Sequence, residues 1–255
     1  MKALGFLLLV CNSLLGQTVL QNAALQSFGS ASGSTGPAGG SSDLLSQMNP
    51  TYVWLSKSLA SGKVTAWNDL SNGFALTPFS TSAYPTNNTS ANAGVWFNGT
   101  STCYLTNAGI PFGAGQNYTV AIVLLVVNTA NASGGLCMDR GGNNGALAAY
   151  VNGGYVEFYY SSTMHYPIRT GGIVSNTRYD IVFSCSGGAI TTYTNGVATA
   201  GSMTGVPSWT LACFGGDASN DPFTGYEQKL VVWTNHAASA TEAASFHTYC
   251  STNNP

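Results

Sequence analysis

The side chains that could carry out acid–base chemistry are few in this chain. The glutamates and histidines are Glu157, Glu227, Glu242, His165, His236 and His247. Glycoside hydrolysis needs two carboxyl groups roughly 5 to 10 Å apart across the scissile bond, and no glutamate has an acidic residue two positions away. No Gly-x-Ser-x-Gly or His-Glu-x-x-His motif is present. The sequence therefore predicts that the chain is not an enzyme.

Binding chemistry is better represented, because aromatic faces stack on the C–H surfaces of sugars while amides and hydroxyls hydrogen-bond to them. Aromatic and basic side chains crowd one predicted hairpin region: Tyr155, Tyr159, Tyr160, His165, Tyr166 and Arg169. A polar turn beside it adds Asp139, Arg140, Asn143 and Asn144. These ten residues form the predicted carbohydrate-binding site. The alternatives are that the tyrosines only fill and cover the sheet and that the turn is an ordinary hairpin loop.

A second loop carries oxygen ligands of the kind that calcium prefers. Its residues are Asp217, Asn220 and Asp221. Two carboxylates make a weak calcium site, so ordinary turn chemistry is the alternative for this loop. Apart from this calcium, the sequence predicts no cofactor.

The cysteines indicate one disulfide and no zinc site. Five of the six follow Cys11, an odd number, so at least one stays unpaired or pairs outside the chain. Their spacing contains no Cys-x-x-Cys and argues against zinc. Cys185 and Cys213 are expected in the core. Cys103 and Cys250, near opposite ends of the domain where antiparallel terminal strands often meet, are the predicted pair.

The composition limits both the partners and the fold class. Charged residues make up 6% of the 255 residues and the formal net charge is -2, so no basic field attracts nucleic acid. A neutral surface rich in Asn, Ser, Thr and Tyr favours uncharged, hydroxyl-bearing ligands. A hydrophobic content of 44% excludes a disordered chain. The length suits one all-β domain.

The chain divides into three segments. Residues 1–16 have the basic start, apolar run and small-residue end of a secretory signal peptide, which predicts a secreted, extracellular protein. Residues 17–47 form an N-terminal segment and a flexible Gly/Ser-rich linker, and residues 48–255 form the domain. The apolar run is too short to span a membrane, so the mature chain has no span. The alternative is a retained segment that forms a buried or interfacial helix.

Short apolar runs separated by Gly, Asn, Ser and Pro predict antiparallel strands within the domain. Tyr118–Val127 is almost continuously apolar, which indicates a strand covered on both faces. Asn195-Gly196 predicts a hairpin. Further strands are predicted at Arg178–Cys185, Ala189–Thr194, Leu211–Phe214 and Lys229–Trp233. One helix is predicted after Ser239, because Ser239 and Glu242 have capping-box spacing.

Several segments occur here in a characteristic order: Trp67-Asn68-Asp69-Leu70, Val95–Gly99, Asn176–Phe183, Gly188–Val197, Leu211–Gly216, Phe223–Gly225 and Ser239–Glu242. This order resembles that of laminin-G-like, concanavalin A-like jelly-roll domains of bacterial secreted and phage-tail proteins. The resemblance covers about Met48 to Cys250. It implies a two-sheet antiparallel jelly-roll sandwich with one short C-terminal helix, with Trp67 in the core and Asp69 capping a turn.

These features together predict a secreted, noncatalytic module that binds carbohydrate or another cell-surface polymer. The alternative is a structural subunit of an extracellular filament, virion or phage appendage. In that case the N-terminal segment would anchor the chain, and its partner would be a protein or further copies of itself.

Overall fold

The structure, a computed structural model, describes residues 49–90, 94–127, 136–138, 158–160, 164–166, 174–216 and 223–252. All but Asn49 belong to one unit, Pro50–Pro255. The strands of its first half are β1 (Tyr52–Leu55), β2 (Gly62–Lys63), β3 (Trp67–Asn68), β4 (Ala75–Pro78), β5 (Thr86–Asn87), β6 (Val95–Asn98), β7 (Leu105–Phe112) and β8 (Tyr118–Val126). Those of its second half are β9 (Cys137–Met138), β10 (Phe158–Tyr160), β11 (Met164–Tyr166), β12 (Thr177–Ser186), β13 (Ala189–Thr194), β14 (Val197–Met203), β15 (Trp209–Phe214) and β16 (Thr224–Trp233). A 3-10 helix, η1 (Ser56–Ser58), follows β1, and helix α3 (Ala240–Thr252) follows β16.

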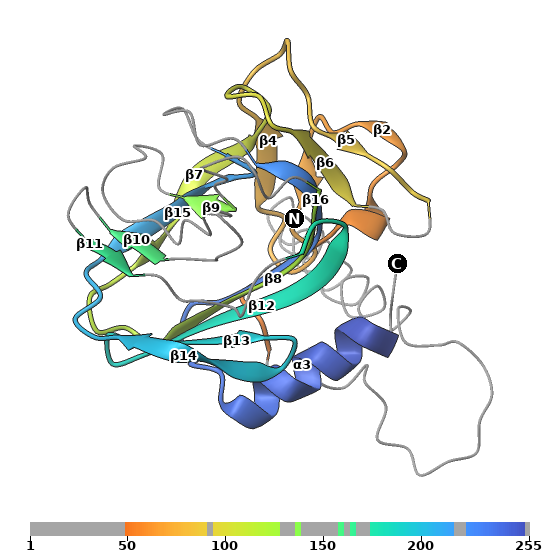
Figure 1. Cartoon of the computed structure of the whole chain (residues 1–255). Helices are drawn as coiled ribbons and strands as arrows, with labels where there is room; N and C mark the ends of the chain where they lie inside the picture. The colour runs from red at the N-terminus through yellow and green to blue at the C-terminus, as the bar shows by residue number, and fades with distance from the viewer. Residues whose placement is uncertain are drawn as a thin grey trace, which may run out of the picture. The chain divides into compact units, whose positions relative to one another are not determined.

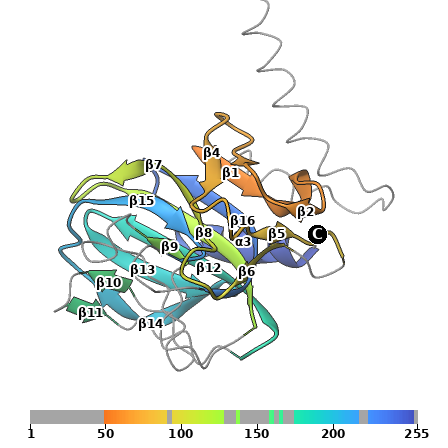
Figure 2. The same cartoon turned by 90° about the horizontal axis from the view of Figure 1, so that it is seen from above.

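The longer strands form two antiparallel sheets (Figures 1 and 2). The nine-stranded sheet has the order β14-β13-β12-β8-β16-β6-β5-β2, with β1 also paired to β16. The five-stranded sheet has the order β3-β4-β7-β15-β9. Strands β10 and β11 pair separately as a hairpin. This arrangement confirms the predicted all-β, two-sheet antiparallel sandwich with one C-terminal helix.

The core lies between the two sheets and is almost entirely apolar. Strand β8 contributes alternate residues, among them Val120, Ile122 and Leu124, and β15 contributes Leu211 and Phe214. The other face of β8 is covered too, so that Leu125 is its one partly exposed residue. The prediction that this strand is covered on both faces is confirmed.

The turns follow the predicted chemistry. Ile181–Ser186 pairs with Ala189–Thr194, and the next turn places Asn195 and Gly196 at φ 50° and 75°. Asn and Gly tolerate such left-handed angles, which match the twist of a two-residue hairpin. Strand β16 begins five residues before the predicted Lys229, because its polar first half pairs with β6 on one side and β8 on the other.

Strand β16 contains a β-bulge that sets which residues share a face. Glu227 lies opposite Leu124 and Lys229 lies opposite Val123, so Gln228 is the extra residue. Because of this insertion, Tyr226 and Lys229 both point away from the five-stranded sheet although they are three positions apart. Gly94 lies against the bulge, where a Cβ atom would approach the Glu227 carbonyl oxygen to 2.6 Å.

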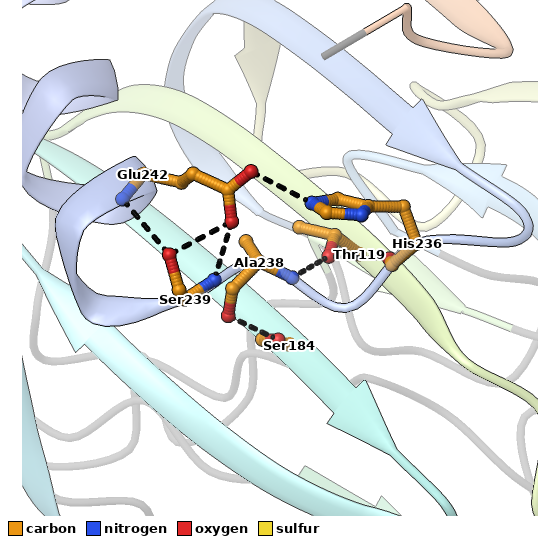
Figure 3. Close-up of polar contacts among 6 residues, drawn as sticks. All are labelled: Thr119, Ser184, His236, Ala238, Ser239 and Glu242. Atoms are coloured by element: carbon orange, nitrogen blue, oxygen red, sulfur yellow. Dashed lines mark hydrogen bonds and ion pairs between the residues drawn. The ribbon is translucent and has the colours of Figure 1, made fainter.

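A capping network fixes the N-terminus of α3 (Figure 3). The Ser239 N–H donates to Glu242 Oε2 at 2.7 Å, and the Glu242 N–H donates to Ser239 Oγ at 3.3 Å. Thr119 Oγ1 accepts from the Ala238 N–H at 2.8 Å, and Ser184 Oγ donates to the Ala238 carbonyl at 2.7 Å. The predicted capping box is confirmed, and β8 and β12 hold the segment that precedes it.

Helix α3 packs its apolar side on the outer face of the nine-stranded sheet, where β12 and β14 contact it (Figure 1). Its buried residues are Ala243, Phe246, Tyr249 and Cys250. At its C-terminal end, Arg178 Nη2 donates to the Cys250 carbonyl at 2.7 Å. A cation is favourable there because the last carbonyls of a helix carry partial negative charge.

The predicted disulfide between Cys103 and Cys250 is not formed. Both thiols are free and buried, because Cys103 lies just before β7 of the five-stranded sheet while Cys250 lies on α3, outside the other sheet. Cys185 and Cys213 are buried as expected.

Trp67 and Asp69 occupy the environments that the resemblance to jelly-roll domains implied, a core position and a turn cap. Trp67 is completely buried. Asp69 accepts hydrogen bonds from the backbone N–H groups of Val53, Ser71 and Asn72 at 2.5, 3.1 and 2.5 Å. It therefore both caps its own turn and ties that turn to β1.

Two further findings apply to the described residues only. They contain no helix with the length and hydropathy needed to cross a bilayer. They also contain no group of three or more His, Cys, Asp or Glu side chains arranged to hold a metal ion.

Replacing the cap residue tests how strongly α3 contributes to the domain. Ser239→Ala removes the acceptor of the Glu242 N–H and should lower the free energy of unfolding by about 1 kcal/mol. For a domain of this size the melting temperature should fall by about 2–4 °C, as measured by circular dichroism. Thr241→Ala, at an exposed position in the first turn of the same helix, is the control. Equal effects of the two substitutions would show that the cap does not stabilise the helix.

Candidate functional site

A row of six cross-strand partners runs across the nine-stranded sheet. From β2 to β12, adjacent strands pair Lys63, Thr86, Trp96, Tyr226, Leu125 and Arg178 in succession. We call these residues the outward row. Neighbouring strands lie about 4.8 Å apart, so the six positions span about 24 Å measured along the sheet.

The side chains of this row point away from the sandwich core. Directly paired residues in antiparallel strands share a face, and successive residues alternate between faces. Val95 and Phe97, on either side of Trp96, both belong to the core, so Trp96 lies on the opposite face. None of the six row residues is fully buried, and Lys63 is exposed.

An aromatic pair occupies the centre of the row. The rings of Trp96 and Tyr226 are 4.7 Å apart between centroids and are tilted by 45°. Next to this pair, Asn98 and Thr224 are the following cross-strand partners on the same face. The surface thus combines two partly exposed aromatic rings with amide and hydroxyl groups, which is the combination that recognises sugars.

The two ends of the row are basic. Lys63 Nζ lies 5.2 Å from the ring centroid of Tyr84, a cation–π distance. At the other end, the bond from Arg178 to the Cys250 carbonyl orients the guanidinium beside the end of α3. Between each end and the aromatic pair stands one neutral side chain, Thr86 or Leu125.

The binding site predicted from the sequence lies only partly within the described residues. Strands β10 and β11 pair Tyr159 with His165, Phe158 with Tyr166 and Tyr160 with Met164 at the level of Cα atoms, so the predicted hairpin is present. The remaining members lie outside the described residues: Tyr155, Arg169, Asp139, Arg140, Asn143 and Asn144. The same holds for the calcium candidates Asp217, Asn220 and Asp221.

The outward row was not predicted from the sequence. Trp96 and Tyr226 are 130 positions apart, and only the pairing of β6 with β16 brings them together. The alternation in Val95-Trp96-Phe97 was a usable signal, because a large aromatic residue between two core residues of a strand must face outward. The register that aligns it with Tyr226 carries no local signal.

One polar cluster contains a serine, a histidine and an acid (Figure 3). Ser239 Oγ donates to Glu242 Oε2 at 2.8 Å, and His236 Nε2 lies 3.0 Å from Glu242 Oε1. Nucleophilic catalysis by serine needs the hydroxyl bonded to the imidazole and the acid behind it. Here the carboxylate lies between the other two groups, so this cluster caps the helix.

A second histidine pairs with an acid on the outer face of the nine-stranded sheet. His247 Nδ1 lies 2.6 Å from Asp180 Oδ2, and Asp180 is nearly buried while His247 is partly exposed. The backbone N–H of Asp180 also donates to Asn195 Oδ1 at 3.1 Å. The His247–Asp180 pair joins α3 to β12, and the Asp180 backbone in turn contacts the hairpin turn between β13 and β14.

Glu227 is an acid buried between the two sheets. It is fully buried, and neither carboxyl oxygen has a hydrogen-bond partner in the described part of the chain. Burial raises its pKa well above the ordinary value. The buried Cys137 thiol also has a raised pKa, first because of burial and then because of the proximity of Glu227. Burial therefore disfavours the ionised form of Glu227 in the folded domain.

No protein-family model and no curated protein matches this sequence. Several solved structures share its fold. A Trypanosoma rangeli sialidase in complex with 2,3-difluoro-KDN has a TM-score of 0.66 at 10% identity, over 95% of this chain and 40% of that chain. Domain 4 of an extracellular arabinanase from Geobacillus stearothermophilus, in complex with arabinotriose, has a TM-score of 0.61 at 16% identity, over 78% of this chain and 98% of that domain. The receptor-binding domain of botulinum neurotoxin type G has a TM-score of 0.52 at 11% identity, over 78% of this chain and 51% of that chain.

These likenesses correct one prediction. The expectation that the chain is not an enzyme is wrong, because the structures that share its fold include sialidases, which are enzymes. The chain spans about two-fifths of the length of those sialidases, and at these identities the likeness shows the fold alone. The likenesses show the β-sandwich fold, whereas the laminin-G-like or phage-tail type stays a prediction.

Glu227→Gln should remove a pH-dependent loss of stability. The folded-state pKa of Glu227 lies above the unfolded value, so its contribution is fully present below the unfolded pKa and is lost as pH rises through the folded pKa. The wild type should therefore lose stability as pH rises through the folded-state pKa of Glu227. The amide variant does not titrate and should lack this loss, as measured by urea unfolding over a series of pH values.

Glu242→Gln is the matched control with the opposite sign. Burial tends to raise the pKa of Glu242, but bonds from Ser239 and the proximity of His236 outweigh burial and lower it. Its contribution is therefore present above the unfolded pKa and lost as pH falls through the folded value. If Glu227→Gln lost stability with rising pH as steeply as the wild type, the account of a buried acid with a raised pKa would be wrong.

Proposed function

We propose that this domain binds glycans, and that the outward row is its binding surface. The observation that carries the proposal is the adjacency of Trp96 and Tyr226 on the outer face of the sheet, 4.7 Å apart and only partly buried. Two aromatic rings side by side offer an apolar platform to successive sugar rings. Strands hold both rings in place, so little conformational entropy is lost when a ligand binds.

Polar groups of defined position surround the platform. Thr86 flanks Trp96 within the row, and Asn98 Oδ1, in the next pair, accepts hydrogen bonds from the N–H and hydroxyl of Thr100 at 3.0 and 2.7 Å. Those bonds fix the orientation of the Asn98 amide and leave its N–H groups facing away from Thr100. Sugar hydroxyls act as both donors and acceptors, so such amide and hydroxyl groups complement them.

Two of the structures with this fold support the proposal. One is an arabinanase domain whose complex contains arabinotriose, and this chain aligns to 98% of that domain. The other is a toxin domain that binds a receptor. We further propose that the chain is secreted, as the signal-like start favours.

The aromatic pair should dominate the affinity for glycans. Trp96→Ala and Tyr226→Ala should each weaken binding of a glycan found on an array by about ten-fold, since loss of an aromatic contact of about 1–1.5 kcal/mol corresponds to that factor. Isothermal titration calorimetry measures the change. Phe79→Ala is the control, because Phe79 is an exposed ring stacked on Tyr104 outside the row.

The same experiment separates the outward row from the hairpin predicted from the sequence. Tyr159→Ala and Tyr160→Ala remove two of the three aromatic residues of β10. If these variants lose binding while Trp96→Ala retains it, the binding surface is the hairpin and the outward row is the wrong assignment. If no variant changes binding, neither surface holds the glycan.

A further inference from the structure

The basic side chains of the described residues gather on one face of the sandwich. They are Lys57, Lys63, Arg178 and Lys229. Lys63 and Arg178 end the outward row, and Lys229 faces the same side beyond the bulge, opposite Val123. Lys57 lies in η1, near enough to Lys229 for its charge to lower the pKa of Lys229. This concentration occurs in a chain with only seven Lys and Arg residues in all.

The outward row itself contains no acidic side chain. Of the acids in the described part, Glu227 lies between the sheets, Asp69 caps its turn by β1, and Glu242 caps the far end of α3. Asp180 shares the outer face, where His247 contacts it at 2.6 Å and where its negative charge partly offsets the lowering of the Lys229 pKa by burial. The two charged side chains of the row, Lys63 and Arg178, are therefore both basic, although the chain as a whole has a formal net charge of -2.

The placement of the cations suits a ligand that lies across the strands. Arg178 is two strand spacings from Tyr226, and Lys63 is two spacings from Trp96, which is about 10 Å in each case. A sugar stacked on either ring carries its substituents to within reach of a long basic side chain at that distance. Hydrogen bonds from charged donors to carboxylate or sulfate are about twice as strong as neutral ones.

Part of this charge also serves the fold. Arg178 bonds to the last turn of α3, and Lys229 Nζ lies 5.4 Å from the ring centroid of Tyr249. Lys63 is exposed and lies in β2, at the opposite end of the row from Arg178. Its positive charge at that end of the row is the part that helix packing does not explain.

We propose that the glycan is acidic: a polysaccharide with carboxylate or sulfate groups, whose sugar rings lie on Trp96 and Tyr226 while its acidic groups face Lys63 and Arg178. The proposal rests on the function proposed above and names its ligand class. It differs from the uncharged ligand expected from composition, because the average over the chain conceals an uneven distribution of charge.

Binding to three polymers tests the proposal on the domain in its full chain. The probes are polygalacturonate, which carries carboxylates, dextran sulfate, which carries sulfates, and neutral dextran, each measured by affinity electrophoresis and calorimetry. We expect at least one acidic polymer to bind more tightly than dextran. The affinity should fall as salt rises, because exposed charges are screened over about 10 Å at 0.1 M. Preference for one acidic polymer identifies the acidic group.

Single substitutions link this preference to the row. Lys63→Gln should weaken binding of the acidic polymer about three-fold, as expected for an exposed ion pair, and should leave the melting temperature unchanged. Thr241→Glu, at an exposed position in the first turn of α3, changes the net charge by the same amount as Lys63→Gln and should leave binding unchanged.

The outcomes separate this inference from the proposed function. If neutral dextran binds as tightly as the acidic polymers and Trp96→Ala abolishes both, the ligand class is wrong while glycan binding at the row stands. If Thr241→Glu weakens binding as much as Lys63→Gln, the effect belongs to net charge and the inference fails. If Trp96→Ala binds all three polymers like the wild type, the proposed surface itself is wrong.

Discussion

The arrangement of this domain depends on the single-residue bulge in β16. Before the bulge, Tyr226 faces outward and Glu227 faces the core, and after it Lys229 faces outward while Leu230 returns to the core. A regular strand would place Tyr226 and Lys229 on opposite faces, because side chains alternate with a period of two. The extra residue therefore lets one strand carry an aromatic platform and a buried lysine on its outer face. It also places an acid between the sheets, and Gly94 permits the close approach of β6 that this geometry needs.

Three charged side chains in the described part of the chain lie beside a helix end or an aromatic ring. Lys229 is almost fully buried, and burial lowers its pKa to about 8, yet it lies over the ring of Tyr249. Arg178 bonds to the C-terminal turn of α3, whereas Glu242 bonds at its N-terminal turn. Positive charge at the carbonyl end and negative charge at the amide end both stabilise a helix. The helix is thus attached electrostatically at each end and by apolar packing along its middle.

The sequence predicted those parts of the fold that local chemistry determines. Asn195-Gly196 specified a hairpin, and Ser239 with Glu242 specified the start of α3, because turns and caps depend on residues within four positions of each other. The polar first half of β16 was not predicted as strand, since Tyr226-Glu227-Gln228 lacks the apolar pattern and is extended only through its partners. For the same reason the outward row was not predicted, since its members come from six strands.

The predicted disulfide between Cys103 and Cys250 was wrong because distance in sequence gives no information on which side of a sandwich a residue lies. We expected that the chain is not an enzyme because catalytic motifs are absent from the sequence. The absence of a motif does not show in which proteins a fold occurs.

The central claim is that the outer face around Trp96 meets the ligand. The other four tryptophans, Trp54, Trp67, Trp209 and Trp233, are at most 3% exposed, so the indole N–H signals in a ¹⁵N-labelled sample distinguish this face from the core. Titration with an acidic oligosaccharide, followed by heteronuclear NMR, should shift the Trp96 indole signal progressively and leave the four buried indoles in place. A bound ligand that leaves the Trp96 signal unmoved, while backbone signals of β10 and β11 shift, would contradict the account.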